Sequence, residues 1–298
     1  MVLNTQPTSN VTITLTSNDT TAATVTSPLT FTSGNWSTPQ TVTITGVNDA
    51  DAVSETVTIS HALSGGGYNA VTMTNFTATM TDDDVFISGD IFNGKVYLTV
   101  TSPDTGRVWL DRNLGATQVA ASSTDSAAYG DSYQWGRATD GHELRSATTA
   151  TTATATLATT ISPGVNAFVT NSTAPYDWTS ADSAGSSRVS AWNSGGANDI
   201  CPSGFSVPTE AEITADTISA TTTDITNGAT AFSSFLKIPV AGYRNRVVGA
   251  LRDVGSYAFL WSRSAYGAFG RGLGVGGGGA DFYSLDRANG FSVRCIKD

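Results

Sequence analysis

Apolar and polar residues alternate along the first 80 residues of the chain. Segments in which every second position is apolar or β-branched recur at short intervals, with turn-forming residues between them. A period of two is typical of half-buried β-strands, because successive side chains of a strand point to opposite faces. The segments are residues 11–16, 23–26, 29–32, 41–45, 55–60 and 76–80. They predict a small all-β domain over residues 1–84.

Six or seven short strands in about 80 residues are typical of an immunoglobulin-like β-sandwich. The segment LTFTSGNWSTPQTVTITGVNDAD, residues 29–51, resembles the Calx-β-like and immunoglobulin-like repeats of large bacterial surface proteins. The resemblance implies an extender repeat that presents the domain following it.

The alternation ends after residue 84, where aromatic residues and arginines become frequent. The bulky apolar residues that could build one core are Trp109, Trp135, Phe205, Val207, Tyr243, Trp261, Phe291 and Val293. The segment SVPTEAEI, residues 206–213, predicts a short helix with Thr209 as N-cap and Glu212 as its third residue. Few helices, short strands and long loops indicate a loop-rich α+β domain over residues 85–298.

Five sequence blocks follow one another in this second region. They are GRVWLDRNLGA (106–116), YGDSYQWGRATDGHE (129–143), CPSGFSVPTEAE (201–212), IPVAGYRN with GALRDVGSYAFLWSRS (238–264) and ANGFSVRCIKD (288–298). In this order they resemble the Fibrobacter-type major paralogous domain, a C-type-lectin-like family of exported bacterial proteins, and the related peptide-binding modules of RTX adhesins. The resemblance implies a C-type-lectin-like fold and calcium-dependent capture of the C-terminal peptide of a protein on another cell.

The charge balance narrows the possible partners. The chain has 25 acidic and 15 basic residues, a net charge of −10, and residues 1–84 contain no lysine or arginine. Nucleic-acid binding depends on Lys and Arg that neutralise phosphates, so nucleic acid is not expected as a partner. An acidic composition favours divalent cations and a solvated extracellular surface. The resemblance to the adhesin modules implies a monomeric module of a secreted adhesin.

Acidic residues gather where strands and loops are expected to end, and Ca²⁺ takes about six to eight oxygen ligands. We therefore expect Ca²⁺ as a cofactor. The predicted ligands are Asp49, Asp51, Glu55, Asp82, Asp83 and Asp84 in the first domain, and Asp177, Asp182, Asn198, Asp199, Asp281 and Asp286 in the second. The alternative is a set of solvated acidic loops.

Basic residues are concentrated in residues 225–280, which contain five arginines and Lys237 but only one acidic residue, Asp253. Arginine suits bidentate capture of a carboxylate. Residues 268–280 predict a Gly-rich loop without room for core residues, whose amides could donate to an extended ligand. The predicted ligand-binding residues are Arg244, Asn245, Arg263, Tyr266, Arg271, Gly277, Gly278 and Tyr283. The alternative is that Arg244 and Arg263 form internal salt bridges and that the glycines form only a flap.

Two other functions compete with peptide capture. A glycan ligand would use Ca²⁺ to bridge vicinal hydroxyls and Tyr266 or Trp192 to stack on the sugar. A hydrolase would use Glu210 and Glu212, but the helix cap accounts for Glu212, and no enzymatic activity is expected. The segment HELRS lacks the second histidine of a metalloprotease helix, so we expect His142 to be a structural, hydrogen-bonded histidine. Arg137, Asp140 and Glu143 are expected to hold a turn together.

The two cysteines, Cys201 and Cys295, are too few for a zinc site. We expect one disulfide if the protein is exported, with two buried thiols as the alternative. The chain has no apolar run of about 18 residues, so membrane insertion is not expected. Residues 1–10 lack the pattern of a secretory signal and begin inside a Thr-rich strand pattern, which suggests part of a longer chain.

Overall fold

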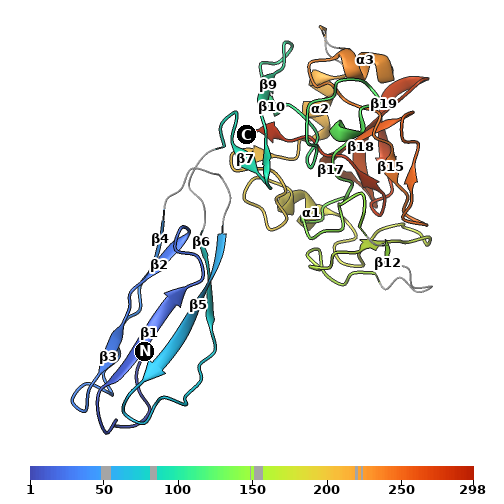
Figure 1. Cartoon of the computed structure of the whole chain (residues 1–298). Helices are drawn as coiled ribbons and strands as arrows, with labels where there is room; N and C mark the ends of the chain where they lie inside the picture. Colours follow the sequence, from blue (N-terminus) through green and yellow to red (C-terminus); the bar gives the residue numbers. More distant parts are fainter. Residues whose placement is uncertain (48–54, 81–85, 148, 151–156, 219–220, 223) are drawn as a thin grey trace. The chain divides into compact units, whose positions relative to one another are not determined.

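The computed structural model covers residues 1–298 and describes all of them except 48–54, 81–85, 148, 151–156, 219–220 and 223. The chain divides into two compact units, Met1–Asp84 and Val85–Asp298 (Figure 1). We call them unit 1 and unit 2 and describe each by itself. In the described part of both units strands outnumber helices, most of the sheets are antiparallel, and the few helices are short.

The described part of unit 1 contains a four-stranded sheet in the order β3-β1-β5-β6 and a two-stranded sheet of β2 and β4. The strands are β1 (Val11–Ser17), β2 (Ala23–Val25), β3 (Leu29–Phe31), β4 (Ile44–Gly46), β5 (Glu55–Ser64) and β6 (Phe76–Met80). The expected alternation is confirmed in β1, where Val11, Ile13 and Leu15 are buried and Thr14 and Thr16 are exposed. The buried face packs into one core with residues of β3 and β5.

The described part of unit 2 contains two four-stranded sheets of short strands, in the orders β14-β21-β10-β9 and β11-β20-β15-β16. Their strands are β9 (Thr99–Thr101), β10 (Val108–Leu110), β11 (Tyr133–Gln134), β14 (Phe205–Ser206), β15 (Tyr243–Arg244), β16 (Leu251–Arg252), β20 (Gly290–Phe291) and β21 (Ile296–Lys297). Two further strand pairs lie in unit 2: β7 (Ile91–Phe92) with β8 (Lys95–Val96), which is antiparallel, and β12 (Thr149–Ala150) with β13 (Phe168–Val169), which is parallel.

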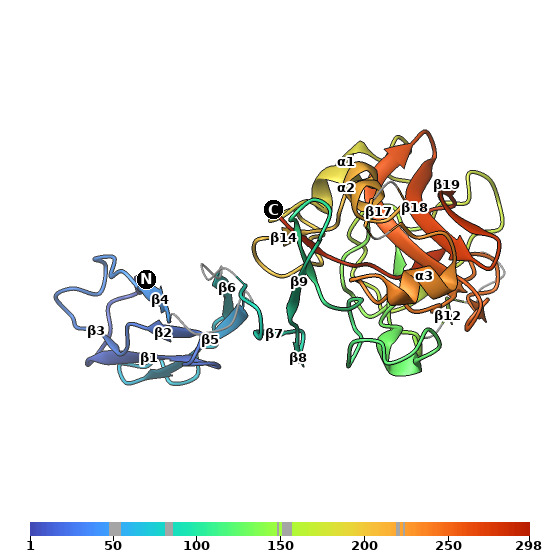
Figure 2. The same ribbon diagram turned by 90° about the horizontal axis from the view of Figure 1, so that it is seen from above.

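The longest strands of unit 2 form a third sheet, in the order β17-β18-β19. They are β17 (Ala258–Tyr266), β18 (Phe269–Gly276) and β19 (Gly279–Leu285), drawn in orange to red in Figure 2. β18 pairs antiparallel with β17 on one side and with β19 on the other. One face of this sheet packs against the main apolar cluster of unit 2, through residues such as Leu260, Leu273 and Phe282.

The described part of unit 2 contains three short α-helices, α1 (Ser186–Ala191), α2 (Glu210–Asp216) and α3 (Gly228–Ser233), and one 3-10 turn, Ser126–Ala128. The capping box predicted for α2 is confirmed. The Thr209 hydroxyl accepts a hydrogen bond from the Glu212 N–H at 3.2 Å, and Glu212 Oε2 accepts one from the Thr209 N–H at 2.7 Å. No helix in the described ranges is both long and apolar enough to cross a lipid bilayer.

Buried tryptophans tie the loops of unit 2 to residues 133–137. The indole N–H groups of Trp261, Trp178 and Trp192 donate to the backbone carbonyls of Tyr133, Trp135 and Arg137, respectively, at 2.8 to 3.0 Å. A buried indole N–H must find an acceptor, so these bonds fix three distant segments to one short stretch. Residues 133–137 therefore form the centre of the unit.

Candidate functional site

A slot of about 350 Å³ opens on the β17-β18-β19 sheet. It is lined by Tyr257, Phe259, Gly274, Val275, Gly276, Gly278, Gly279, Tyr283 and Leu285. We call it the glycine slot. None of its lining residues carries a charge, and none is a histidine or cysteine. A site of this composition suits a neutral group that is bound through apolar contact and a few hydrogen bonds.

The floor of the glycine slot is the backbone of β18. The odd-numbered residues Leu273 and Val275 are buried in the apolar cluster, whereas the even-numbered residues 270, 272, 274 and 276 are all glycine. Side chains alternate between the two faces of a strand, so one face of β18 carries core residues and the other carries none. The expected Gly-rich loop over residues 268–280 is thus largely a strand, and the expectation that it has no room for core residues is wrong.

The glycines are required because aromatic rings lie directly on the strand. A Cβ built on Gly276 would lie 2.3 Å from the ring of Tyr257, and one on Gly274 would lie 2.9 Å from the ring of Tyr283. Real Cβ atoms do not come so close to another side chain, so any other residue would push the rings away. Glycine at these two positions sets the depth of the slot.

The walls of the slot are the aromatic rings of Tyr257, Phe259 and Tyr283, which lie against the glycines of β18. Tyr257 and Phe259 are stacked, with centroids 6.2 Å apart and planes 15° apart, and Phe259 stacks in turn on the buried Phe291 at 4.8 Å. Tyr257 is 44% exposed and Tyr283 48% exposed. The slot therefore presents two accessible phenol rings that are backed by a rigid aromatic column.

The outer edge of β19 lies beside the slot and pairs with no other strand in the described ranges. One of its backbone donors, the Phe282 N–H, uses the neighbouring Asp281 Oδ1 as acceptor at 2.7 Å. An N–H that bonds to a local side chain is available to a competing acceptor at small cost. β19 is therefore an open edge strand, which is a template for pairing with another extended chain.

Two of the arginines predicted to bind ligand have internal roles. Arg244 is 3% exposed and donates to the backbone carbonyls of residues 142, 144, 147 and 249. Arg271 makes a bidentate ion pair with Glu210 at 2.5 and 2.7 Å and also donates to Ser284. Those donors are used inside the protein, which corrects the expectation that they capture a ligand carboxylate. The pairing also gives Glu210 a structural role.

The remaining predicted ligand residues are scattered. Arg263 donates to the Ser206 hydroxyl and the Val207 carbonyl and lines a separate polar hollow. The Asn245 side chain accepts hydrogen bonds within its own turn, and Tyr266 is exposed at the end of β17, outside the slot lining. Gly278 and Tyr283 do line the slot, and Gly277 is in the turn between β18 and β19. Trp192, a predicted sugar platform, is fully buried and cannot stack on a ligand.

The oxygens of four predicted calcium ligands bind protein groups instead. Asp177 makes a bidentate ion pair with Arg188 at 2.7 Å, and Asp182 accepts from the Arg188 N–H at 2.9 Å. Asn198 bonds to the Ser162 hydroxyl and to two backbone carbonyls, and Asp199 accepts from two backbone N–H groups. These contacts correct the expectation of one calcium site in these loops, because the carboxylates already neutralise or cap internal groups.

The described residues among the other predicted calcium ligands do not form a group of three potential metal ligands. Asp286 pairs with Arg246 at 2.6 Å, and Asp281 is exposed on β19. Glu55 is half-buried at the start of β5. Asp49, Asp51, Asp82, Asp83 and Asp84 lie outside the described residues.

In the described ranges, the one group of three potential metal ligands is Asp140, His142 and Glu143, whose ligand atoms lie within 4.8 Å of one another. Such a group could hold a metal ion. Both ring nitrogens of His142 are already bonded, however: Nδ1 lies 2.7 Å from Asp140 Oδ1, and Nε2 accepts from the Gln134 N–H at 3.0 Å. A metal would have to displace one of these bonds, and the nitrogen of His142 is not the oxygen ligand that Ca²⁺ prefers.

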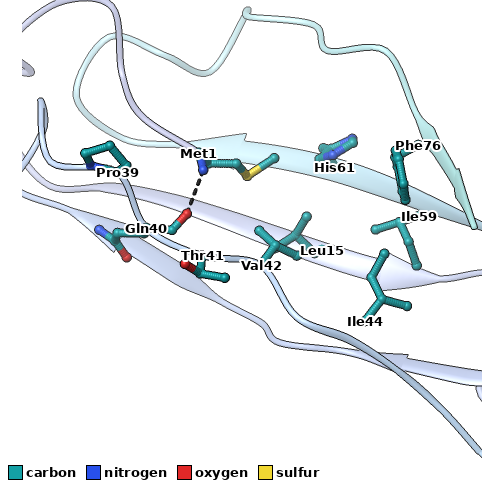
Figure 3. Close-up of a pocket in the computed structure, with 10 residues that line it drawn as sticks. All are labelled: Met1, Leu15, Pro39, Gln40, Thr41, Val42, Ile44, Ile59, His61 and Phe76. Atoms are coloured by element: carbon teal, nitrogen blue, oxygen red, sulfur yellow. Dashed lines mark hydrogen bonds between the residues drawn. The ribbon is translucent and has the colours of Figure 1, made fainter.

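Unit 1 has an apolar groove of about 570 Å³ between its two sheets, shown in Figure 3. Leu15, Val42, Ile44, Ile59 and Phe76 line it together with Met1, Pro39, Gln40, Thr41 and His61. His61 Nδ1 is buried without a hydrogen-bond partner among the described residues. The N-terminal ammonium of Met1 donates to the Gln40 carbonyl at 2.6 Å, and no lining side chain is that of an acid, lysine or arginine.

Cys201 and Cys295 form a disulfide with their Cα atoms 5.9 Å apart. The bridge joins residues 94 positions apart and connects the segment before β14 to the residue that precedes β21, the last strand of the chain. Comparisons of the chain with protein-family models, with curated proteins and with solved structures found no match.

Tyr257, Phe259, Gly274 and Gly276 line the slot but are not among the predicted ligand-binding residues. The signal that could have found them is the strict period of two in GRGLGVG, residues 270–276, which is the pattern of a strand with one bare face. Glycine is uncommon in strands, and this hid the pattern.

Proposed function

We propose that the chain is the ligand-binding region of a bacterial surface adhesin. Unit 1 would be an immunoglobulin-like extender repeat, and unit 2 a C-type-lectin-like module that binds a peptide segment of a protein on another cell. The five sequence blocks support the adhesin assignment through their family resemblance, and the disulfide supports an extracellular location. The observation that carries peptide binding is the open edge of β19 beside the glycine slot.

The peptide would add a strand to β19. In this mode the main chains of peptide and protein exchange hydrogen bonds, and pockets for alternate side chains provide selectivity. The glycine slot lies on one face of β19 and would receive one side chain of the added strand. That side chain would contact Tyr257 and Tyr283 at the walls of the slot and Gly274 and Gly276 at its floor.

Capture of a terminal carboxylate receives less support than strand addition. The lining of the slot carries no cation, and the donors of Arg244 and Arg271 are used internally. We therefore assign recognition to the peptide backbone and one neutral side chain rather than to the chain end. A binding role, as opposed to a catalytic one, is supported by the internal roles of Glu210 and Glu212.

We keep calcium as a proposed cofactor of the acidic segments at residues 49–55 and 82–84. These segments carry clustered carboxylates on a chain of net charge −10, which a divalent cation would stabilise. Calcium at these segments would stiffen the chain without contacting the peptide. The chelator EDTA should then lower the melting temperature and leave peptide affinity unchanged.

Selection from a random peptide library on the whole chain, followed by calorimetric titration, tests this function. Selected peptides should bind equally well with free and with amidated ends, in calcium and in EDTA. Gly276→Ala should weaken binding about tenfold or more, because displacing Tyr257 removes the burial of one side chain, worth about 1.5 kcal/mol or more. Gly277→Ala is the matched control, since its Cβ would meet nothing within 4 Å.

Three results would contradict the proposal in different ways. Failure to select any peptide would reject peptide binding altogether. Binding that Gly276→Ala leaves unchanged would move the site away from the glycine slot. Binding that is lost with amidated ends or in EDTA would favour calcium-assisted capture of the terminal carboxylate.

A glycan ligand is the second candidate function, favoured by the two accessible tyrosine rings and the uncharged lining of the slot. A sugar ring could stack on Tyr257 or Tyr283 with its hydroxyls bonded to the turn of glycines. A glycan array separates the two functions. Binding to a glycan that Tyr283→Ala abolishes, without any selected peptide, would establish the second.

A further inference from the structure

Asp281 lies next to the glycine slot on the same face of β19. It stands two positions before Tyr283, and residues two apart in a strand share a face. In the sheet, Asp281 is opposite Gly274, and Tyr283 is opposite Gly272. Both side chains are exposed. A ligand that pairs with β19 and fills the slot therefore passes directly over Asp281.

The carboxylate of Asp281 forms no ion pair with the described residues, although Arg271 is near enough to interact with its charge. No Lys, Arg or His nitrogen of those residues lies within 4.0 Å of its carboxylate, and its bonded partner is the adjacent Phe282 N–H. Arg271, which lies on the neighbouring strand, is held by Glu210 in a bidentate pair. A second chain that took over the Phe282 N–H would release this carboxylate toward the ligand.

The size of the slot limits what enters it. At about 350 Å³ it is at the lower end of the range for ligand pockets, about 300 to 1,000 Å³. It therefore fits one side chain or ring rather than several residues. Its neutral lining excludes a charged group at this position, since a charge would lose its water without gaining a partner.

We propose that the bound peptide carries a basic residue over Asp281 and, two positions away, an uncharged apolar or aromatic residue in the glycine slot. This inference rests on the proposed peptide function and specifies its ligand. The order of the two residues depends on whether the added strand runs parallel or antiparallel to β19. Attraction between the acidic protein and the basic residue adds to the selectivity.

Defined peptides test the inference directly. The probe is a threonine-rich peptide, acetylated and amidated, with lysine and phenylalanine two positions apart, prepared in both orders. Its matched versions carry glutamate for lysine, serine for phenylalanine, or the two residues three positions apart. Calorimetric titration is made with the wild-type chain, with Asp281→Asn, with Asp224→Asn as an exposed acid elsewhere in unit 2, and with Gly276→Ala.

One order of the probe should bind the wild type, and each altered peptide should bind more weakly. Asp281→Asn keeps an acceptor for the Phe282 N–H but removes the charge, so it should weaken the lysine peptide about two- to fivefold, the range of an exposed ion pair. Asp224→Asn should have no effect. The preference for lysine over glutamate should disappear in Asp281→Asn and diminish in high salt.

Failure of the inference and failure of the function give different results. If all peptides bind the wild type equally and Gly276→Ala weakens them all, the function stands and the stated ligand is wrong. If the lysine preference persists in Asp281→Asn, Asp281 is not its source and the inference is overturned. If no peptide binds, or if Gly276→Ala changes nothing, the proposed function itself fails.

Discussion

His142 links two segments of unit 2 by hydrogen bonds from both ring nitrogens. Nε2 accepts from the Gln134 N–H, so Nδ1 must carry the proton that it shares with Asp140 Oδ1. The ring is fully buried, and burial lowers the pKa of His142 to about 4 despite the nearby Asp140. The structural role expected for His142 follows from this neutral, doubly bonded state.

NMR titration of the imidazole nitrogens should find His142 as the neutral Nδ1–H tautomer down to about pH 5. In an unfolded chain its pKa is near 6.5. Between pH 6.5 and 4 the unfolded chain therefore binds a proton that the folded chain does not, and this residue's contribution to stability is lost as pH falls through that window. A ring that titrates near pH 6.5 would contradict the buried hydrogen-bonded state.

Direct titration of His142 is needed because two partly buried carboxyls change stability with pH in the opposite direction. Burial raises the pKa of Asp131 and of Asp199 to about 6. These carboxyls bind a proton more tightly in the folded chain, so their contribution to stability rises as pH falls from about 6 to 4. A melting curve would report the sum of the opposing effects and would not isolate His142.

The role of a single residue is predictable from sequence only when its partners are also visible in the sequence. The role of His142 was predictable because the partner types that catalysis needs are absent nearby. The roles of Arg244 and Asp177 were not predictable, since groups that they bind lie 102 and 110 residues away in the chain. A charged residue on a loop has the same appearance in sequence whether it faces solvent or a buried partner.

At the scale of elements, the start of α2 allows a direct test of whether its N-cap residue, Thr209, stabilises the helix. Thr209→Ala removes the hydroxyl that accepts from the Glu212 N–H and should cost about 1 kcal/mol of unfolding free energy. Chemical denaturation monitored by tryptophan fluorescence measures this change. Thr173→Ala is the matched control, because Thr173 is exposed and its hydroxyl makes no hydrogen bond to the described residues. Equal stability of the two variants would contradict the capping role.

Elements with a local code were predictable, and those without one were not. The strand β1 follows from its alternation and α2 from its capping box. The strand β18 was expected as a loop, because its glycines give no propensity for a strand and its purpose depends on rings of β17 and β19. The slot exists only when three strands are assembled, so its walls could not be identified from any one of them.

At the scale of the whole molecule, the disulfide sets the stability of unit 2. Closing a loop of 94 residues stabilises the folded state by about 4 to 5 kcal/mol in the chain-entropy model. Replacing Cys201 and Cys295 together by serine should therefore lower the calorimetric unfolding temperature of unit 2. The transition of unit 1, which contains no cysteine, is the internal control. A shift in both transitions, or in neither, would contradict this assignment.

The same bridge affects how the protein responds to proteases. A single cut anywhere between Cys201 and Cys295 would leave two fragments that remain covalently joined. The glycine slot lies within that span, on strands that pack into the core of unit 2. A molecule nicked there would migrate as one species until it is reduced, and its fragments would have no means of drifting apart.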